Sequence, residues 1–400
     1  MFDKTISVLG LGYIGLPTAS LLGTKGYQVV GIDVNPAVVE RINQGEIHIV
    51  EPDLDVLVKS AVLSGHLSAA NEPVAADIHI IAVPTPLGDN NVPDLAYVEA
   101  ATKSLLSVLK SGDLIILEST VPIGTTEHTV ARIVAEAGFD TAKDIFVAHC
   151  PERVLPGQIL RELVENDRIV GGLNPQSTQA AVAFYETFVR GEVLATNAAT
   201  AEMAKLTENA FRDVNIAYAN ELSLICDRLD INVWELIRLA NRHPRVNILN
   251  PGPGVGGHCI AVDPWFIVSS APEVSPLIQT ARQVNEHKPH WVVKKVEEKA
   301  DRFKHPVIAC LGLAFKANVD DLRESPALAI TQELAKRKDW EVLVCEPNVE
   351  QLKEFDLLPM DEVIERADIV LVLVDHKEFL QLDAASLKEK IIIDTRGIIL

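Results

Sequence analysis

The 400-residue sequence has little positive charge for its length. It carries 36 lysines and arginines against 56 aspartates and glutamates, a formal net charge of −20. Such a chain offers no electrostatic footprint for duplex nucleic acid and is repelled by an anionic membrane surface, so we expect neither as its main partner. Apolar residues make up 48% and charged residues 23%, which is typical of a folded chain of two or three domains.

Cysteine and long apolar runs are also scarce. Five cysteines stand far apart without a Cys-x-x-Cys pair, so we expect no disulfide framework, and we predict no metal site. The most apolar stretch, residues 5–23, is interrupted by Gly10, Gly12, Gly15 and Pro17, unlike a signal peptide or membrane anchor. A soluble, cytoplasmic protein is therefore expected.

The order of predicted elements is α/β, then helical, then α/β. Residues 199–229 lack glycine and proline and have apolar residues at helical spacing, and a second helical block covers residues 275–303, with Pro289 predicted to kink it. We predict two Rossmann-like doubly wound α/β domains joined by a long central helix and a helical region. The expected boundaries are 1–198, 199–303 and 304–400.

Short aliphatic and β-branched runs predict the strands, and amphipathic stretches predict the helices between them. The predicted strands are Thr5–Leu9, Gln28–Ile32, Ile78–Val83, Leu114–Glu118, Ile145–Ala148, Val307–Leu311, Glu341–Cys345, Ile369–Val374 and Ile391–Asp394. The predicted shorter helices are 36–44, 94–109, 125–137, 327–336 and 360–366.

A Gly-x-Gly-x-x-Gly motif follows the first predicted strand. Gly10 permits the tight turn, Gly12 lets a pyrophosphate approach the backbone, and Gly15 lets the helix pack on the strand. The second strand ends at Asp33, an acceptor suited to the adenosine ribose, and no arginine follows for a 2′-phosphate. We therefore predict NAD as the cofactor, with a Rossmann turn that binds no ligand as the alternative.

The stretch from Asn250 to Pro264, Asn-Pro-Gly-Pro-Gly-Val-Gly-Gly-His-Cys-Ile-Ala-Val-Asp-Pro, is too rich in glycine and proline for regular structure. A thiol in such an open loop, here Cys259, can reach a substrate, which a core cysteine cannot. The alternative is a small buried hydrophobe. His258 is equally consistent with a catalytic and a loop-shaping role.

Several separated motifs resemble the UDP-glucose/GDP-mannose dehydrogenase family over essentially the whole chain. They are the glycine motif, Glu118-Ser-Thr-Val-Pro-Ile-Gly-Thr125, Cys150-Pro-Glu-Arg153, Lys205-Leu-Thr-Glu-Asn209, the Cys259 loop, Gly312-Leu-Ala-Phe-Lys316, Arg323-Glu-Ser-Pro326 and Asp394-Thr-Arg-Gly397. The resemblance implies that a primary alcohol at C6 of a nucleotide sugar is oxidised to a carboxylate while two NAD are reduced. It assigns residues 1–198 to NAD, 199–303 to dimerisation and the catalytic loop, and 304–400 to the UDP-sugar.

The resemblance also implies roles for individual residues. Cys259 is the nucleophile, Lys205 is a general acid and base, and Asn209 helps to steady an oxyanion. Asp263, Thr120 and Glu152 serve water activation and thioester hydrolysis. Lys205 and Asn209 lie four residues apart and so share one helix face; either residue alone has a solvated surface position as its alternative.

A UDP-sugar carries two negative charges, so the site needs cations. The cofactor residues implied by the resemblance are Gly10, Gly12, Tyr13, Ile14, Gly15, Asp33, Thr85, Thr120 and Arg323. Those implied for the substrate are Arg153, Val154, Lys205, Asn209, Arg212, His243, Arg245, Gly256, Phe315, Lys316 and Arg396. For each arginine alone, a surface salt bridge is the alternative.

The expected substrate is a UDP-N-acetylhexosamine. Glucose-specific members have a glutamate where this chain has Pro156, and often a lysine where it has Val262. Those departures favour UDP-N-acetyl-D-mannosamine, with UDP-N-acetyl-D-glucosamine as the alternative. A non-catalytic NAD-binding regulator and a two-electron hydroxyacid dehydrogenase are further alternatives. The long helix and the resemblance together predict a homodimer or a higher homo-oligomer.

Overall fold

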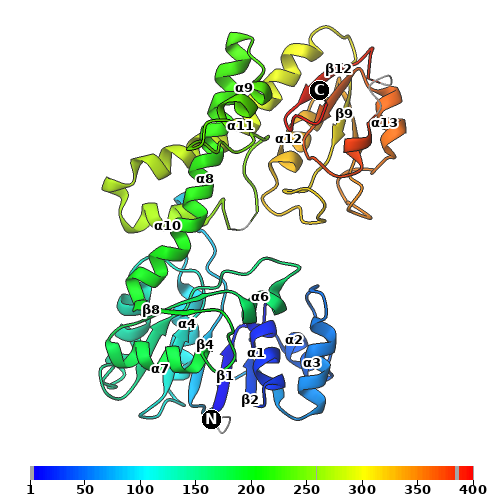
Figure 1. The fold of residues 1–400 in the computed structure, drawn as a ribbon. Coiled ribbons are helices and arrows are strands. Elements are labelled where there is room, and N and C mark those ends of the chain that lie inside the picture. The colour runs from blue at the N-terminus through cyan, green and yellow to red at the C-terminus, as the bar shows by residue number, and fades with distance from the viewer. Residues whose placement is uncertain (1–3, 258, 383–386, 400) are drawn as a thin grey trace. The chain divides into compact units, whose positions relative to one another are not determined.

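The computed structural model of the chain describes residues 4–257, 259–382 and 387–399. The chain forms two compact units (Figure 1). Unit 1 contains Met1–Thr207 and Trp265–Ala271, and unit 2 contains Glu208–Pro264 and Pro272–Leu400. His258, for which the sequence left two roles open, lies outside the described residues.

Unit 1 is built on an eight-stranded sheet in the order β3-β2-β1-β4-β5-β6-β7-β8. Its pairings are parallel except that of β6 with β7, which is antiparallel. Several of its strands are buried apolar runs, as parallel strands covered on both faces must be. The strands are β1 (Thr5–Leu9), β2 (Gln28–Ile32), β3 (Leu67–Ala70), β4 (Ile78–Ile81), β5 (Leu114–Leu117), β6 (Phe146–His149), β7 (Arg168–Gly172) and β8 (Val193–Asn197).

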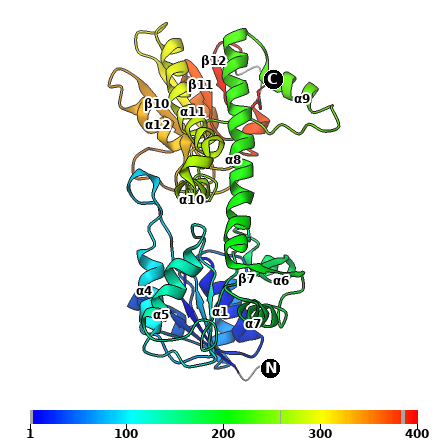
Figure 2. The ribbon, with the colours of Figure 1, turned by 90° about the vertical axis from the view of Figure 1, so that its left-hand side faces the viewer.

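Helices cover both faces of this sheet, and each face has its own apolar core. Helices α1, α2, α3, α6 and α7 contribute to one core and α4 and α5 to the other, and Figure 2 shows α4 and α5 on the side of the sheet away from α7. The helices are α1 (Gly15–Thr24), α2 (Pro36–Asn43), α3 (Leu54–Leu63), α4 (Ala96–Leu105), α5 (Arg132–Glu136), α6 (Ile159–Glu165) and α7 (Pro175–Tyr185), with 3-10 turn η1 (Asp89–Asn91) and π-helical segment η2 (Thr126–Ala131).

Unit 2 contains a parallel four-stranded sheet in the order β10-β9-β11-β12. Helices α11 and α12 pack on one face, and α13 and 3-10 turn η4 on the other (Figure 1). The strands are β9 (Val307–Leu311), β10 (Glu341–Cys345), β11 (Ile369–Val372) and β12 (Ile391–Asp394). The remaining helices of the chain are α8 (Ala198–Leu229), α9 (Val233–Ala240), α10 (Asp263–Ser270), η3 (Pro272–Val274), α11 (Pro276–Ala300), α12 (Pro326–Ala335), α13 (Met360–Arg366) and η4 (Phe379–Gln381). The part of α8 up to Thr207 and the part of α10 from Trp265 belong to unit 1.

The predicted fold class, two doubly wound α/β domains with a helical region between them in the chain, is confirmed. The long central helix is α8, which starts one residue before the predicted start and ends at the predicted residue. Helix α11 continues through Pro289, which lies inside it. The three-part boundaries remain a prediction.

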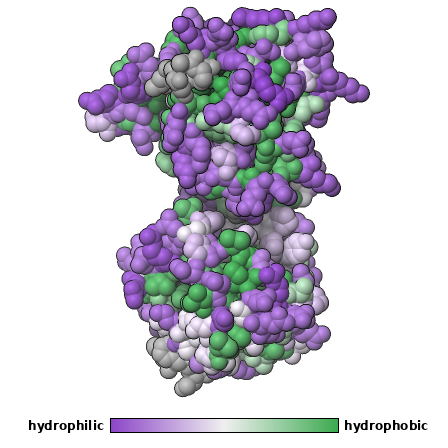
Figure 3. All heavy atoms as spheres, turned by 90° about the vertical axis from the view of Figure 1, so that its right-hand side faces the viewer, coloured by the Kyte–Doolittle hydropathy of each residue, from purple (hydrophilic) through white to green (hydrophobic). Residues whose placement is uncertain are grey.

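The surface is mainly polar on the face that Figure 3 draws, where hydrophilic residues predominate and hydrophobic residues form small groups. Within the described residues, no helix is both long enough and apolar enough to cross a membrane.

Candidate active site

The glycine motif forms a tight turn between β1 and α1 in unit 1. Gly10 has a φ of +89°, and a Cβ at this position would lie 2.7 Å from the carbonyl oxygen of Ala82. A Cβ on Gly15 would lie 1.8 Å from the Gly10 carbonyl oxygen, whereas one on Gly12 would have nothing within 4 Å. The turn is therefore closed on the sheet side and open at Gly12, as the approach of a pyrophosphate requires.

The helix that follows the turn can hold an anion at its N-terminus. No described side chain caps α1, and within its first turn the amides of Leu16 and Thr18 already donate to Gly12 and Ile14, so the attraction for phosphate oxygens comes from the positive end of the helix dipole. Asp33, directly after β2, accepts hydrogen bonds from the amide of Leu11 to Oδ2 (3.1 Å) and from the amide of Asn35 to Oδ1 (2.9 Å). This carboxylate is half-buried and keeps acceptor capacity for ribose hydroxyls. The residues present therefore fit NAD.

Two predicted threonines meet beside this turn. Thr85 follows β4 and Thr120 follows β5, and the hydroxyl of Thr85 donates to the carbonyl oxygen of Thr120 (2.6 Å). Strands β2, β1, β4 and β5 are parallel neighbours, so Asp33, Gly10, Thr85 and Thr120 all lie at the carboxyl edge of one sheet. Ligands of open α/β sheets bind at this edge.

Glu152 belongs to a buried charge cluster. Its Oε2 pairs with Nη1 of Arg168 (2.8 Å), and its Oε1 accepts from the amide of Arg153 (2.6 Å). Beside it, Glu118 accepts from the hydroxyl of Tyr185 (2.6 Å); burial raises the pKa of Glu118 to about 7, although Arg168 acts in the opposite direction. Arg153 itself reaches the carbonyl oxygen of Asp167, and Val154 packs on the core.

A third buried carboxylate, that of Glu202 in the first turns of α8, holds the loop that carries Thr120. It accepts from the amides of Gly124 (2.6 Å) and Thr126 (2.8 Å) and from the Thr126 hydroxyl (2.6 Å). Lys205 follows three residues later on the same helix and is half-buried. Sequence reasoning missed Arg168, Tyr185 and Glu202, because each acts on a motif residue from a distant part of the chain.

The cysteine loop lies in unit 2. The carbonyl oxygen of Cys259 accepts from the amide of Asp263 (2.8 Å), and the Asp263 carboxylate accepts from the side-chain amide of Asn209 on α8 (2.5 Å). Asn209 and Asp263 are buried, while Cys259 is half-exposed. The structure thus brings three predicted catalytic residues together.

The other four cysteines differ from Cys259 in exposure. All four are buried, and burial raises the pKa of the Cys150, Cys310 and Cys345 thiols to about 12. A thiol that is buried and held protonated neither reaches nor attacks a substrate. Of the five, Cys259 is therefore the one suited to act as a nucleophile.

The loop before Cys259 packs against the segment after β9. A Cβ on Gly256 would lie 2.3 Å from the Glu324 carbonyl oxygen, and one on Gly257 would lie 2.9 Å from the Phe315 ring. The amide of Gly257 donates to the carbonyl oxygen of Arg323 (3.3 Å). Gly256, Phe315 and Arg323, predicted from separate motifs, therefore meet around one loop.

Arg396 also reaches this loop. A Cβ on Gly252 would lie 2.6 Å from Nη1 of Arg396, whose guanidinium pairs with Asp375 (2.8 Å). Arg323 pairs with Asp321 (2.6 Å), and Lys316 is exposed beside Phe315. Three further predicted residues are exposed and, in the described part of the chain, make no hydrogen bond to the cysteine loop: Arg212, His243 and Arg245.

The dinucleotide turn lies at the carboxyl edge of the mainly parallel sheet of unit 1, and the accessible cysteine loop packs against the segment after β9 in unit 2. Together they indicate an NAD-dependent oxidoreductase. Residues 4–189 match the NAD binding domain of the UDP-glucose/GDP-mannose dehydrogenase family, residues 199–287 match its central domain, and residues 309–400 match its UDP binding domain. The chain belongs to this family. The predictions of the family, of the enzyme class and of NAD as cofactor are confirmed.

Relatives and solved structures agree over nearly the whole chain. The NDP-N-acetyl-D-galactosaminuronic acid dehydrogenase of Ralstonia nicotianae is 58% identical over 98% of this chain and 96% of its own length. The UDP-N-acetyl-D-mannosamine dehydrogenase of Campylobacter jejuni is 55% identical, over 96% and 98%. The structure of a UDP-D-ManNAc dehydrogenase from Pyrococcus horikoshii superposes with a TM-score of 0.89 at 42% identity, covering 99% of this chain and 96% of that one.

Proposed function

We propose that the protein oxidises UDP-N-acetyl-D-mannosamine at C6 to UDP-N-acetyl-D-mannosaminuronate. The observation that carries the proposal is the identity of 55% to relatives named for UDP-N-acetyl-D-mannosamine, from Campylobacter jejuni and Yersinia pestis, over at least 96% of the chain. The overall change converts the alcohol and one water to a carboxylate, and it releases two hydrides and three protons.

A second substrate has an observation in its favour. The Ralstonia nicotianae relative is 58% identical and is named for an N-acetyl-D-galactosaminuronic acid. UDP-N-acetyl-D-galactosamine, the C4 epimer of UDP-N-acetyl-D-glucosamine, is therefore a candidate beside the mannosamine and glucosamine forms. All three share the UDP group, the N-acetyl group and the C6 alcohol on which the chemistry acts.

In the proposed mechanism, the glycine turn and Asp33 of unit 1 would hold NAD, which would supply the hydride acceptor for both oxidations. Cys259, as the thiolate, adds to the C6 aldehyde, which gives a thiohemiacetal. Loss of the second hydride gives a thioester, and water then hydrolyses it to the carboxylate and regenerates the thiol. Covalent capture keeps the reactive aldehyde on the protein.

The other predicted catalytic residues act on protons and charge. Asn209 is the amide donor that holds the Asp263 carboxylate, and Asp263 in turn fixes the backbone at Cys259, so this trio orients the thiol and a water. We assign general acid and base catalysis to Lys205, water positioning to Thr120, and thioester hydrolysis to Glu152. Arg168 orients Glu152 through their ion pair.

The proposed substrate contacts divide by chemistry. Phe315 stacks on an apolar face of the substrate, and Lys316 and Arg396 supply positive charge to its pyrophosphate. Arg153, Val154, Arg212, His243, Arg245 and Gly256 complete the proposed set, and Tyr13, Ile14 and Arg323 complete the cofactor contacts.

The substrate assignment is tested with the purified protein, NAD and the three UDP-N-acetylhexosamines in parallel. We expect the highest kcat/KM with UDP-N-acetyl-D-mannosamine and two NADH formed per sugar. One NADH per sugar would contradict four-electron oxidation. A preference for the galactosamine or glucosamine substrate would change the sugar assigned to the protein but leave the proposed mechanism unchanged.

The cysteine mechanism is tested with Cys259→Ser. A serine hydroxyl is a much weaker nucleophile than a thiolate, so we expect turnover to stall after capture or after the first hydride transfer. Cys226→Ser, a change at a buried cysteine on α8, is the matched control and should retain four-electron turnover. Full four-electron activity in Cys259→Ser would contradict the mechanism.

We also propose that the protein forms a homodimer through α8 and acts in the cytoplasm. Phe211, Tyr218, Ile225 and Leu229 are exposed apolar residues of this helix, seven, seven and four positions apart, so they form one stripe. Such a stripe is stabilised when a second copy covers it. Light scattering that shows a monomer at working concentration would contradict the dimer.

A further inference from the structure

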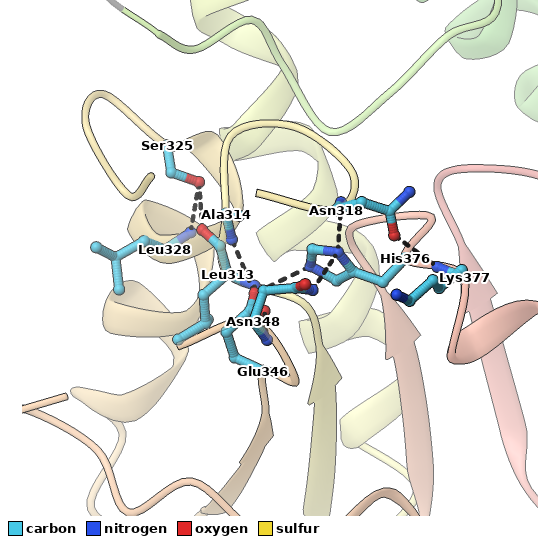
Figure 4. Close-up of polar contacts among 9 residues, drawn as sticks. All are labelled: Leu313, Ala314, Asn318, Ser325, Leu328, Glu346, Asn348, His376 and Lys377. Carbon is cyan, nitrogen blue, oxygen red and sulfur yellow. Dashed lines mark hydrogen bonds and ion pairs between the residues drawn. The ribbon is translucent and has the colours of Figure 1, made fainter. Parts of the chain in front are cut away.

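The segment after β9 carries Phe315 and Lys316 but has no regular structure of its own before α12. Its first residues are tied to the strand that lies next to β9 in the sheet. Glu346, directly after β10, accepts hydrogen bonds at Oε2 from the amides of Leu313 (2.7 Å) and Ala314 (3.0 Å) (Figure 4). Its Oε1 accepts from the amide of Asn348 (2.9 Å).

His376, which follows β11, extends this anchor to the far side of the turn. Its Nδ1 accepts from the backbone amide of Asn318 (2.9 Å), which can only donate, so in the neutral ring the proton lies on Nε2. Nε2 then donates to Oε2 of Glu346 (3.1 Å). Asn318 is held a second time, because its side-chain oxygen accepts from the amide of Lys377 (3.0 Å).

Both residues are buried in this network, His376 fully and Glu346 to 4% exposure. Burial alone would raise the pKa of Glu346, but the hydrogen bonds from His376 and from the backbone lower it overall. A carboxylate can be buried at a low cost in free energy only when donors fill its acceptor sites. Here four donors fill those of Glu346. The acceptor sites of this carboxylate are therefore used to hold the segment around the turn.

We propose that Glu346 and His376 are positioning residues for the nucleotide of the substrate. They hold the backbone on both sides of Phe315 and Lys316, Glu346 at residues 313–314 and His376 at Asn318. The inference rests on the proposed function, in which Phe315 and Lys316 bind the UDP group. Neither residue of the pair needs to touch the substrate, since each acts by fixing the turn that does.

Two substitutions test the pair. In His376→Gln the amide nitrogen replaces the Nε2 donor to Glu346, but the acceptor for the Asn318 amide is lost. Glu346→Gln keeps the shape of the side chain but replaces one carboxylate oxygen with an NH₂ group, which then faces hydrogen-bond donors and cannot accept from them. Thr331→Val is the matched control: Thr331 is buried in α12 of the same unit, and its hydroxyl donates within its own helix, to the carbonyl oxygen of Ala327 (2.9 Å).

The readouts are the Kd of UDP and the Kd of NAD, measured separately by calorimetric titration of the full chain, with KM, kcat and the melting temperature. We expect both test variants to raise the Kd of UDP about tenfold, the effect of losing roughly one buried hydrogen bond. KM for the nucleotide sugar should rise more than kcat falls, and the Kd of NAD should stay within about twofold. Thr331→Val should lower only the melting temperature.

Two results would overturn the proposal. If the test variants lower the melting temperature as Thr331→Val does but leave the Kd of UDP unchanged, the pair serves only the stability of unit 2. If Glu346→Gln does not fold, His376→Gln decides alone, because it keeps the donor to the carboxylate. Failure of the unaltered protein to bind UDP would instead refute the proposed function, and the inference with it.

Discussion

The two units begin their sheets with the same β–loop–α–β arrangement but use its acidic residue differently. In unit 1 the segment is β1, α1 and β2; in unit 2 it is β9, α12 and β10. Gly10 and Gly312 each follow the first strand with a φ near +90°, and their amides donate to Ile32 (2.8 Å) and Cys345 (2.9 Å) on the second strand. The backbone conformation and the hydrogen bond of the glycine after the first strand are therefore the same in both units.

The carboxylates that follow the second strand differ. Asp33 accepts from two backbone amides and is half-buried, whereas Glu346 accepts from three backbone amides and His376 and is buried. A carboxylate has about four acceptor sites, so Asp33 keeps some for a ribose and Glu346 keeps none. The difference follows from the loops: residues 10–14 form a short turn that Asp33 holds at one amide, that of Leu11, while residues 312–325 form a longer segment that Glu346 and His376 hold at three amides.

The largest expected effects on ligand binding come from substitution of the two glycines. Gly10→Ala places a Cβ 2.7 Å from the Ala82 carbonyl oxygen, and Gly312→Ala places one 2.5 Å from Cβ of Val374, both at a left-handed φ. Strain and overpacking together cost about 3 kcal/mol, or roughly 100-fold in affinity. Calorimetric titration should show loss of NAD binding only in Gly10→Ala and loss of UDP binding only in Gly312→Ala. Equal losses of both ligands in either variant would contradict separate nucleotide sites.

The comparison extends to buried charge, where unit 2 holds an ammonium group. Burial lowers the pKa of Lys288 to about 7, against the pull of Asp227 on α8; its Nζ donates to the Ser223 hydroxyl (2.5 Å) and lies over the Trp291 ring. Because the ordinary value is 10.5, the unfolded chain binds a proton between pH 7 and 10.5 that the folded chain lacks. The contribution of Lys288 to the free energy of unfolding therefore rises with pH over this range, by up to about 5 kcal/mol. Urea unfolding of Lys288→Met at several pH values should show a free energy of unfolding that lacks this rise with pH. The same dependence on pH as in the unaltered protein would contradict the assignment to Lys288.

One buried acid of unit 1, Glu118, should contribute a pH dependence of the opposite sign. The pKa of Glu118 is raised by burial from 4.5 to about 7, so the folded chain keeps a proton that the unfolded chain loses between these values. The contribution of Glu118 to the free energy of unfolding then falls as pH rises from about 4.5 to 7, by up to about 3 kcal/mol. The side chain in Glu118→Gln cannot ionise. The free energy of unfolding of this variant, relative to that of the unaltered protein, should therefore increase between pH 5 and pH 8 in urea unfolding. A constant difference over this range would show that Glu118 is ionised in both states.

The same comparison shows what the sequence could predict. Strands such as Thr5–Leu9 and Val307–Leu311 have the predicted bounds, because aliphatic runs between a charged residue or proline and a glycine allow little else. Strand β3, Leu67–Ala70, was missed because alanine and serine carry no β signal, and β7 because it starts with a buried arginine and ends in two glycines.

The site residues that the sequence could predict are also those with a strong local signal. Gly10, Asp33 and Cys259 lie in local motifs whose spacing has a chemical meaning, so the sequence predicts them. Glu346 and His376 stand in no motif, and their roles depend on strands β9, β10 and β11 lying side by side. Residues that position others become visible only when the sheet order is known.

The smallest expected effect decides whether the two carboxylates really differ. Asp33→Asn keeps the shape of the side chain, and its amide oxygen can still accept from the Leu11 amide. The hydrogen bond from the Asn35 amide is lost, but it is exposed and water can replace it, so the turn should survive with little change in melting temperature. Losing the charge weakens the hydrogen bond to a ribose hydroxyl by about 1.5 kcal/mol, which raises the Kd of NAD roughly tenfold and leaves the Kd of UDP unchanged. Titration with each ligand measures both constants. If the Kd of NAD stays within about twofold while the melting temperature falls, Asp33 serves only to hold its own loop, as Glu346 does, and the contrast between the two units is wrong.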